Sequence, residues 1–357
     1  MLTISAKCIF IFLIATTTTF LANPFVNRIG LKLNIIDKPN HRKIHEKAIV
    51  RFGGVSILLG FITSLIIFFI SFGSDYLIQA EFLIFTKVLC GAFVFFIVGI
   101  LDDLFQISPF IRLFLQVITS LLLVINGIGI FNLDISFINE KFYFELNSSF
   151  AFLITTLWIV GVTNSINWLD GLDGLSSGFS IIFTIAILMI SISLGNFIFA
   201  FSAVAIIGSC TSYLFYNFRP AKIMMGDSGS YFLGYTLATF SIFYDSSSSI
   251  NFNPFLSLLI LLVPIADMTY VILRRILNSS SPFFPDRNHI HHRLLNYGFD
   301  KDKTLLSIYG LSIISISLAI IIFFSINLFI NYMIGCFLFF VFIKFMFYKN
   351  SHIISKN

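Results

Sequence analysis

Long apolar segments recur along almost the whole chain, and they constrain its fold more than any other feature. A membrane-spanning helix needs about 20 predominantly apolar residues. With 57% apolar and only 11% charged residues, the chain has too little polar surface to cover a water-soluble globule. We therefore expect an all-α integral membrane protein, one polytopic domain over residues 1–357, with about eleven transmembrane helices. The expected spans are roughly 4–24, 53–73, 82–101, 110–131, 150–165, 175–194, 197–216, 229–245, 254–273, 304–325 and 326–348.

The basic residues predict how these helices are oriented. When the gaps between the segments are assigned alternately to the two sides of the membrane, one side receives 18 of the 22 Lys and Arg residues and all six His residues. Because cytoplasmic loops are enriched in Lys and Arg, we expect the N-terminus outside and the C-terminus in the cytoplasm. This topology explains the net charge of +5, so no nucleic-acid partner is expected. The cytoplasmic loops would be 25–51, 102–109, 164–175, 217–228 and 274–303.

Two further expectations concern the first apolar segment and the main loop on the outer side of the membrane. The first segment is also compatible with a cleaved signal peptide that has Lys7 ahead of its apolar stretch. A signal peptide enters with its N-terminus inside, which would move the basic residues of 25–51 outside and violate the charge rule, so a retained helix is preferred. Residues 135–146 roughly alternate between apolar and polar, with a turn near Asn139, and predict a small β-hairpin.

The unusual polar residues gather where helices meet the cytoplasmic surface. Asp102 and Asp103 end the third segment, and Arg112 enters the fourth. Neighbouring helical residues point about 100° apart, so one carboxylate could face a metal or substrate while the other orients a partner. A hydrated helix end is the alternative interpretation. Arg112 is placed where a cation could meet a phosphate.

The second cluster contains two amides and two carboxylates. Asn164 and Asn167 are three residues apart, as are Asp170 and Asp173, so each pair would share a face of a helix. Oxygen ligands of this kind suit a hard cation such as Mg²⁺ together with a polar ligand. An ordinary Asn/Asp/Gly turn explains the intervening glycines, but it does not explain the regular spacing of four oxygen donors.

Two further clusters follow along the chain. Lys222 and Asp227 precede the eighth segment, where a helix N-terminus favours anions and Asp227 could hold Mg²⁺ or act as an N-cap. The segment 285–294 contains three imidazoles and two guanidiniums, which form an anion-binding patch. A lipid-binding basic loop and a zinc site are the second and third interpretations of that segment.

Two other features lead to weaker expectations. The basic segment 38–54 is explained by topology, and Gly53 and Gly54 at its end indicate close packing or backbone approach to a ligand. Asp267 is the carboxylate that lies well inside an apolar segment. Two environments remain open for it: a pairing with an Asn or Lys of another helix, or an orientation toward Arg274 and Arg275.

Acidic, amide, glycine and basic clusters on one membrane face are the groups that phosphoryl transfer needs, because the protein mainly positions phosphates and stabilises charge. The soluble substrate would be a nucleotide-activated compound and the acceptor a lipid, since an enzyme for soluble molecules gains nothing from a multi-span fold. A polytopic transporter of an anionic substrate is the main alternative, but it predicts ionisable residues near the midplane and repeated halves.

Five motifs occur in one order: DDLFQISPFIRLFLQ, NSINWLDGLDGL, NFRPAKIMMGDSGS, PIAD and PDRNHIHHRL. Over residues 35–300 they resemble the polyprenyl-phosphate N-acetylhexosamine-1-phosphate transferase family, glycosyltransferase family 4. That family includes undecaprenyl-phosphate GlcNAc-1-phosphate transferases and, more distantly, phospho-MurNAc-pentapeptide transferases. The HIHH form resembles the GlcNAc branch more closely.

The resemblance implies an eleven-span enzyme of the bacterial inner membrane with its active site facing the cytoplasm. It implies Mg²⁺-dependent transfer (Mn²⁺ is an alternative) of N-acetylhexosamine-1-phosphate, GlcNAc favoured, from a UDP-sugar to undecaprenyl phosphate, with release of UMP. Direct attack and a covalent Asp intermediate both stay open, as does a homodimer. The residues implied are Asn167 and Asp227 as metal ligands, Asp102, Asp103 and Asp173 as catalytic residues, and Asn164, Asp170, Arg112, Lys222, Arg287, His289, His291 and His292 as substrate-binding residues.

Overall fold

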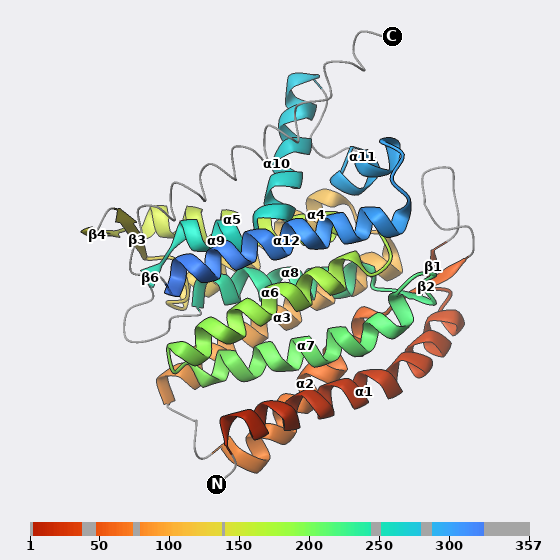
Figure 1. Cartoon of the computed structure of the whole chain (residues 1–357), viewed down its shortest axis with the longest axis horizontal. Helices are drawn as coiled ribbons and strands as arrows, with labels where there is room; N and C mark the ends of the chain where they lie inside the picture. The colour runs from red at the N-terminus through yellow and green to blue at the C-terminus, as the bar shows by residue number, and fades with distance from the viewer. Residues whose placement is uncertain are drawn as a thin grey trace.

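The computed structural model describes residues 3–37, 48–73, 79–137, 140–243, 251–279 and 288–324, which form a helical bundle with small sheets at two opposite ends (Figure 1). The helices are α1 (Ile4–Lys32), α2 (Gly54–Phe72), α3 (Gln79–Phe105), α4 (Pro109–Ile125), α5 (Ser148–Leu169), α6 (Leu175–Ser193), α7 (Phe197–Asn217), α8 (Gly226–Phe243), α9 (Pro254–Ile260), α10 (Leu262–Leu277), α11 (Ile290–Asn296) and α12 (Lys301–Phe324).

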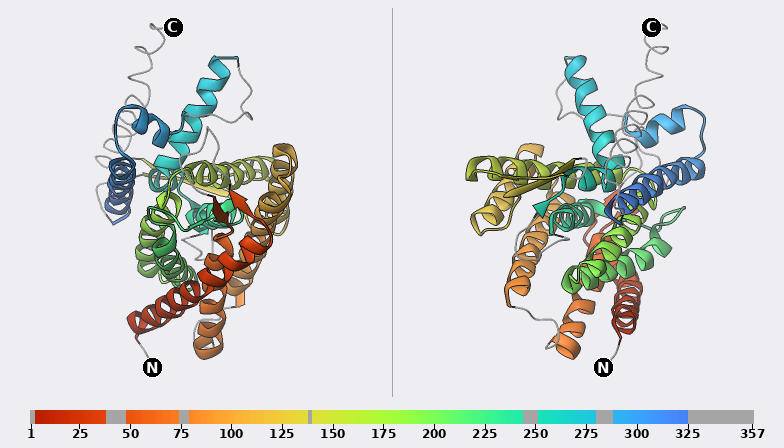
Figure 2. Two further views of the ribbon diagram at one scale, coloured as in Figure 1. Left: turned by 90° about the vertical axis from the view of Figure 1, so that its right-hand side faces the viewer. Right: turned by 60° about the vertical axis from the view of Figure 1, so that its left-hand side comes forward.

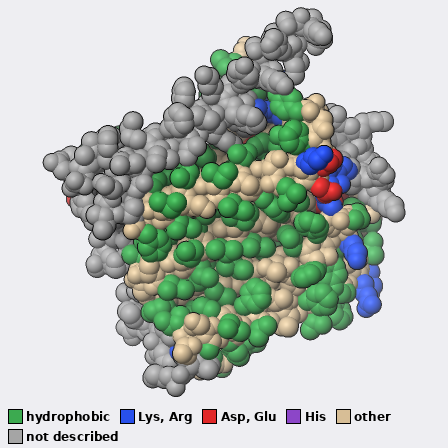
Figure 3. Space-filling model, in the orientation of Figure 1, with side chains coloured by type: hydrophobic (Ala, Val, Ile, Leu, Met, Phe, Trp, Pro, Cys, Tyr) green, Lys and Arg blue, Asp and Glu red, His purple; other side chains and the backbone are tan. Residues whose placement is uncertain are grey.

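Seven of the described helices are long and apolar enough to cross a membrane, and an eighth span results if α9 and α10 are counted as one. The predicted all-helical membrane class is therefore confirmed. α4 is shorter, with 17 residues, and the expected span at 326–348 lies outside the described residues. One broad face of the bundle carries many hydrophobic and few charged side chains, and most of the charged ones gather at the end that carries β1 (Ile36–Asp37) and β2 (Ile49–Arg51) (Figure 3).

The ninth expected span is not one straight helix. The structure divides it at Leu261 into α9 and α10, whose axes differ by 87°, and α10 projects away from the bundle (Figure 2). Pro264 lies in the first turn of α10, where a missing backbone N–H costs nothing because that N–H has no helical partner. The expected span over 254–273 is therefore a pair of helices that meet at a sharp bend, and the proline lies in the first turn of the second helix.

α1 is longer than expected and packs against α2 and α7. Asn23, fully buried on α1, accepts a hydrogen bond of 2.7 Å from the Ser56 hydroxyl of α2. Such an integrated helix is what a retained first span requires.

Glycines allow the central helix α8 to meet its neighbours closely. A Cβ atom added to Gly54 of α2 would collide with the backbone of Gly229, and one added to Gly99 of α3 would collide with the backbone of Asp227 and Ser228. The first turn of α8 is therefore held between α2 and α3 at backbone contact. This confirms the close packing predicted from Gly53 and Gly54.

Two small sheets complete the fold. β3 (Asn132–Phe137) and β4 (Glu140–Glu145) form the predicted antiparallel hairpin, and β6 (Asn251–Phe252) pairs with β3 in parallel. The other sheet was not anticipated. It joins β1 (Ile36–Asp37) antiparallel to β2 (Ile49–Arg51), which pairs in parallel with β5 (Ile223–Met224), and Arg51 lies opposite Met224.

Candidate active site

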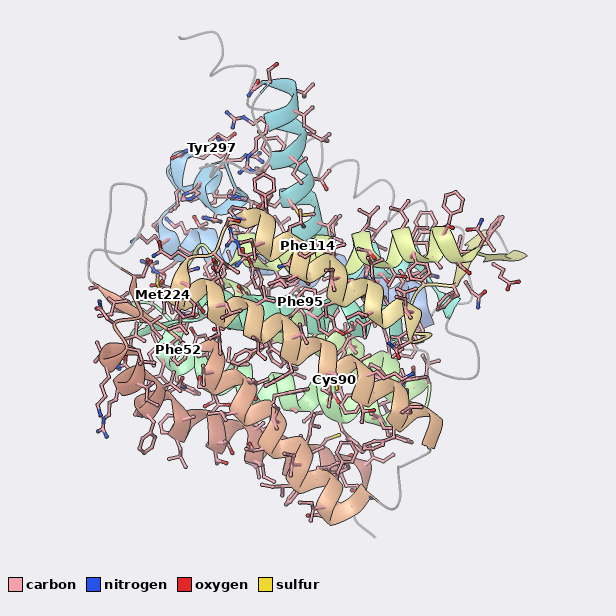
Figure 4. The ribbon with its side chains drawn as sticks, turned by 180° about the vertical axis from the view of Figure 1, so that it is seen from behind. Phe52, Cys90, Phe95, Phe114, Met224 and Tyr297 are labelled. Carbon is pink, nitrogen blue, oxygen red and sulfur yellow. The ribbon has the colours of Figure 1, made fainter. Side chains whose placement is uncertain are left out.

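Asp227, in the first turn of α8, is the centre of the polar cluster at the end of the bundle. It is 7% exposed, and Arg51 Nη2 donates to its Oδ1 at 2.6 Å. The pairing of β2 with β5 explains this contact, because it places Arg51 beside Met224, three residues before Asp227. The Asp227 carboxylate raises the pKa of Arg51 above its usual range, so the guanidinium stays charged. Figure 4 shows the neighbouring Phe52 and Met224 at this end of the bundle, while Cys90 lies far along α3.

Asp103 holds the first turn of α8 from outside the helix. Its Oδ1 accepts the backbone N–H of Asp227 at 2.8 Å, and its Oδ2 accepts that of Ser228 at 2.9 Å. The side chain is fully buried, with Arg51 Nε 3.5 Å from Oδ1. A carboxylate at a helix N-terminus pairs orphan N–H groups and complements the helix dipole. Asp103 therefore fixes the position of Asp227.

The adjacent Asp102 points elsewhere, as the helix geometry predicted. Arg112 Nη1 donates to Asp102 Oδ2 at 2.6 Å and lies 3.8 Å from Asp227 Oδ2. Arg112 thus bridges the carboxylates of α3 and α8. With Arg51, it places two guanidinium groups beside Asp227, a charge arrangement that suits phosphate binding.

The amide pair of α5 lies beside this cluster. Asn167 Nδ2 donates to Asp227 Oδ1 and to Ser230 Oγ, both at 2.8 Å. Asn164, one turn earlier, donates to Gln116 Oε1 at 2.7 Å. The regular spacing correctly placed both amides on one helix. The shared helical face expected for Asp170 and Asp173 was wrong, because α5 ends at Leu169 and both carboxylates lie in the turn before α6.

A cavity of about 290 Å³ opens next to the cluster. Two loop contacts shape its walls: Asp173 Oδ2 accepts the N–H of Ala221 at 3.1 Å, and Asn217 Oδ1 accepts the N–H of Gly174 at 2.9 Å. Burial raises the pKa of Asp170 well above its usual value, although Arg51 opposes the shift. The charged and titratable lining residues are Asp37, Arg51, Asp170, Asp173, Arg219, His292 and Lys301.

The histidines of α11 pack at the edge of this cavity. His291 is 2% exposed, and a Cβ atom on Gly171 would collide with its ring. The His291 and His292 ring centroids are 4.3 Å apart. Burial, and then the neighbouring His292 and His289, lower the pKa of His291 well below its usual value, so its imidazole is neutral at pH 7.

The environment of Asp267 differs from both alternatives considered from the sequence. Its Oδ2 lies 2.9 Å from His289 Nδ1, and its Oδ1 accepts the N–H of Ile290 at 2.7 Å. Its partners therefore come from α11, and neither an Asn or Lys of another helix nor Arg274 and Arg275 supplies these two contacts.

Comparisons with known proteins show the family of the chain. The model of Glycosyl transferase family 4 matches residues 85–245, which include Asp102, Asn167 and Asp227. A probable undecaprenyl-phosphate N-acetylglucosaminyl 1-phosphate transferase of Bacillus subtilis is 36% identical over 87% of this chain and 84% of its own length. The chain belongs to glycosyl transferase family 4.

Two other relatives extend the similarity. An undecaprenyl-phosphate alpha-N-acetylglucosaminyl 1-phosphate transferase of Escherichia coli K12 is 30% identical over 86% of this chain and 81% of its own length. A decaprenyl-phosphate N-acetylglucosaminephosphotransferase of Mycobacterium leprae is 30% identical over 88% of this chain and 83% of its own length. Each alignment is long enough to reach well beyond the family match.

Not every predicted residue joins the site. Lys222 is exposed and is not among the residues that line the cavity, and Arg287 lies outside the described residues. Three cavity residues were not expected from the sequence: Arg51, whose charge was explained by topology, Arg219 and Lys301. The sequence carries little signal for Arg51, because Arg51 and Asp227 are 176 residues apart in the chain. Only the pairing of β2 with β5 brings them together.

The donor set fits a magnesium ion. Mg²⁺ prefers oxygen ligands and is often bound by one or two carboxylates together with waters and substrate phosphates. Asp227 supplies a carboxylate, and rotating the Asn167 side-chain amide by half a turn would present its oxygen at the same place. Among the described residues, no three His, Cys, Asp or Glu side chains converge as metal ligands. Waters and substrate phosphates are the other ligands that Mg²⁺ commonly takes.

Proposed function

We propose that this protein transfers GlcNAc-1-phosphate from UDP-GlcNAc to undecaprenyl phosphate and releases UMP. The reaction would be the first membrane step of a cell-envelope polysaccharide. It would take place in the bacterial inner membrane at an active site facing the cytoplasm, with the N-terminus outside. Membership in glycosyl transferase family 4 and the activities for which the relatives are named support this reaction.

One observation carries the proposal: a buried carboxylate, Asp227, lies between two guanidinium groups at one end of an apolar bundle, beside a polar cavity. Phosphoryl transfer depends on positioning phosphates and neutralising their charge. Arg51 and Arg112 would neutralise the negative charge of the phosphates during transfer. The lipid acceptor would reach the same end of the bundle from the membrane.

The cavity would hold the donor. Arg51, Arg219 and Lys301 line it and would attract the diphosphate, and His292 would contact the diphosphate or the sugar. Asp170 and Asp173 would line the nucleotide part of the site. Asn167 and Asp227 would hold Mg²⁺, which, when bound, draws electron density from the phosphoryl oxygens and so stabilises the charge of the transition state.

In the direct mechanism, an oxygen of the lipid phosphate attacks the β-phosphorus of the donor. A new P–O bond forms to the lipid, and the bond from the β-phosphorus to the oxygen of UMP breaks. Asp102, held by Arg112, would keep the lipid phosphate deprotonated. A covalent route through an Asp would need two displacements, so retention at phosphorus would favour that route and inversion would favour direct attack.

The proposal is tested with purified protein, undecaprenyl phosphate, Mg²⁺ and a panel of UDP-sugars, with UMP release as the readout. We expect release with UDP-GlcNAc, none with EDTA, and none for Asp227→Ala or Asp102→Asn. Asp300→Asn is the matched control, because Asp300 is exposed and lies outside the cavity lining.

The same panel separates the alternatives. UMP release only with UDP-MurNAc-pentapeptide would assign the chain the phospho-MurNAc-pentapeptide transferase activity. Movement of an anion into proteoliposomes without UMP release would support the transporter. Wild-type turnover in the Asp227→Ala variant would reject the metal role.

A further inference from the structure

Asp267 is a buried acid that the proposed chemistry does not use. It lies on α10, is 2% exposed, and both of its oxygens are occupied by α11. A carboxylate withdrawn from water is costly unless it is well hydrogen-bonded. Its position is therefore tied to the contacts with His289 Nδ1 and the Ile290 N–H, which join α10 to the first turn of α11.

A continuous set of ring contacts runs from Asp267 to the cavity. The His289 ring packs edge-on against Trp168, with centroids 5.4 Å apart, and stacks almost parallel on His291 at 5.9 Å and 5°. His291 packs on Gly171 and against His292, and both Gly171 and His292 line the cavity.

We propose that Asp267 is a positioning residue for the sugar-nucleotide donor: it holds His289 in one tautomer and anchors α11, so that His291 and His292 are fixed against the cavity wall. This inference rests on the proposed function, since it takes the donor to be the ligand of that wall. It predicts that Asp267 affects the use of the donor and leaves the KM for the lipid acceptor unchanged.

The hydrogen bonds define which tautomer is held. The Asp267 carboxylate only accepts, so the hydrogen of the neutral His289 ring must lie on Nδ1 and the lone pair on Nε2. An Asn at this position would have to keep its single oxygen on the Ile290 N–H. Its NH₂ group would then face His289 Nδ1 and force the ring hydrogen onto Nε2, with nearly the same shape but the opposite polarity.

The test compares Asp267→Asn, His289→Gln and the double variant, with Asp300→Asn as control. For each, kcat and KM are measured separately for UDP-GlcNAc and for undecaprenyl phosphate, well below the melting temperature. We expect Asp267→Asn to lower kcat/KM for UDP-GlcNAc by about 10- to 100-fold, the range typical when a metal-ligating histidine loses its hydrogen-bond partner. The KM for undecaprenyl phosphate should stay within about twofold of wild type.

The double variant decides between positioning and general stabilisation. If Asp267 acts through His289, adding Asp267→Asn to His289→Gln should lower kcat/KM by less than about twofold, because coupled residues are not additive. Independent, multiplicative losses, or an equal rise in the KM for both substrates, would overturn the inference. If Asp267→Asn does not fold, His289→Gln alone must still show the donor-specific loss.

A wild-type protein that releases no UMP from any UDP-sugar would reject the proposed function itself. An active wild-type protein together with wild-type kinetics in Asp267→Asn would reject only the positioning role.

Discussion

Replacing Asp103 by Asn removes one acceptor at the most constrained point of the site. The carboxylate is fully buried and accepts two backbone N–H groups of α8, at 2.8 and 2.9 Å. Asn has one acceptor oxygen, so one N–H would lose its partner and face an NH₂ group. A charge-assisted hydrogen bond contributes about 1.5–3 kcal/mol. Because removing a negative charge also relieves repulsion with Asp227, we expect a net loss of about 2 kcal/mol in the free energy of unfolding.

The assay combines thermal unfolding of the detergent-solubilised protein with UMP release. Stability and kcat should fall together, since the N–H groups that Asp103 holds belong to the turn carrying Asp227. Asn147→Ala is the matched control: it removes an exposed N-cap of α5, should cost about 1 kcal/mol, and should leave activity unchanged. An Asp103→Asn protein that melts like wild type but has lost activity would refute the positioning role and favour a direct chemical one.

Arg51→Gln should lower kcat about 100-fold, the usual effect of removing one charge-stabilising donor, whereas Arg51→Lys, which keeps the charge near Asp227, should lose less UMP release. Gly99→Ala should destabilise the protein by about 1–3 kcal/mol, because its Cβ overlaps the backbone of α8. Gly310→Ala should not destabilise it, because a Cβ there meets nothing within 4 Å. Melting curves of the two variants test this difference. The pKa of His291 is lower in the folded than in the unfolded protein, so below pH ~6.5 the unfolded chain binds more protons than the folded one. The free energy of unfolding should therefore fall by up to about 1.4 kcal/mol per pH unit as the pH decreases. His291→Gln should show a flatter profile of melting temperature against pH.

Periodicity and local spacing predicted much of the fold and part of the site. The apolar segments predicted the helices because each segment carries its own signal of length and hydropathy. Asn164 and Asn167 could be placed on one face because a helix fixes their relation locally. The hairpin near Asn139 was likewise predicted from its own alternation.

Contacts between distant segments were not predictable in the same way. Arg51 looked like one more basic loop residue because its role depends on the pairing of two short strands, β2 with β5, that carry no strong pattern of their own. The partners of Asp267 lie 22 and 23 residues later, on a helix of seven residues. Pro264 did signal the break at Leu261, but a proline is also tolerated in membrane helices that continue.

The antiparallel pairing of β1 with β2 has a practical consequence. Ile36 pairs with Val50 and Asp37 with Ile49, so both ends of the connection at 38–48 are anchored beside Arg51. Since lengthening a closed loop costs only about 0.6 kcal/mol per doubling, a short epitope inserted there should leave the register of Arg51 intact. Antibody access to that epitope in sealed inside-out vesicles, compared with right-side-out ones, would report directly which compartment the reaction faces.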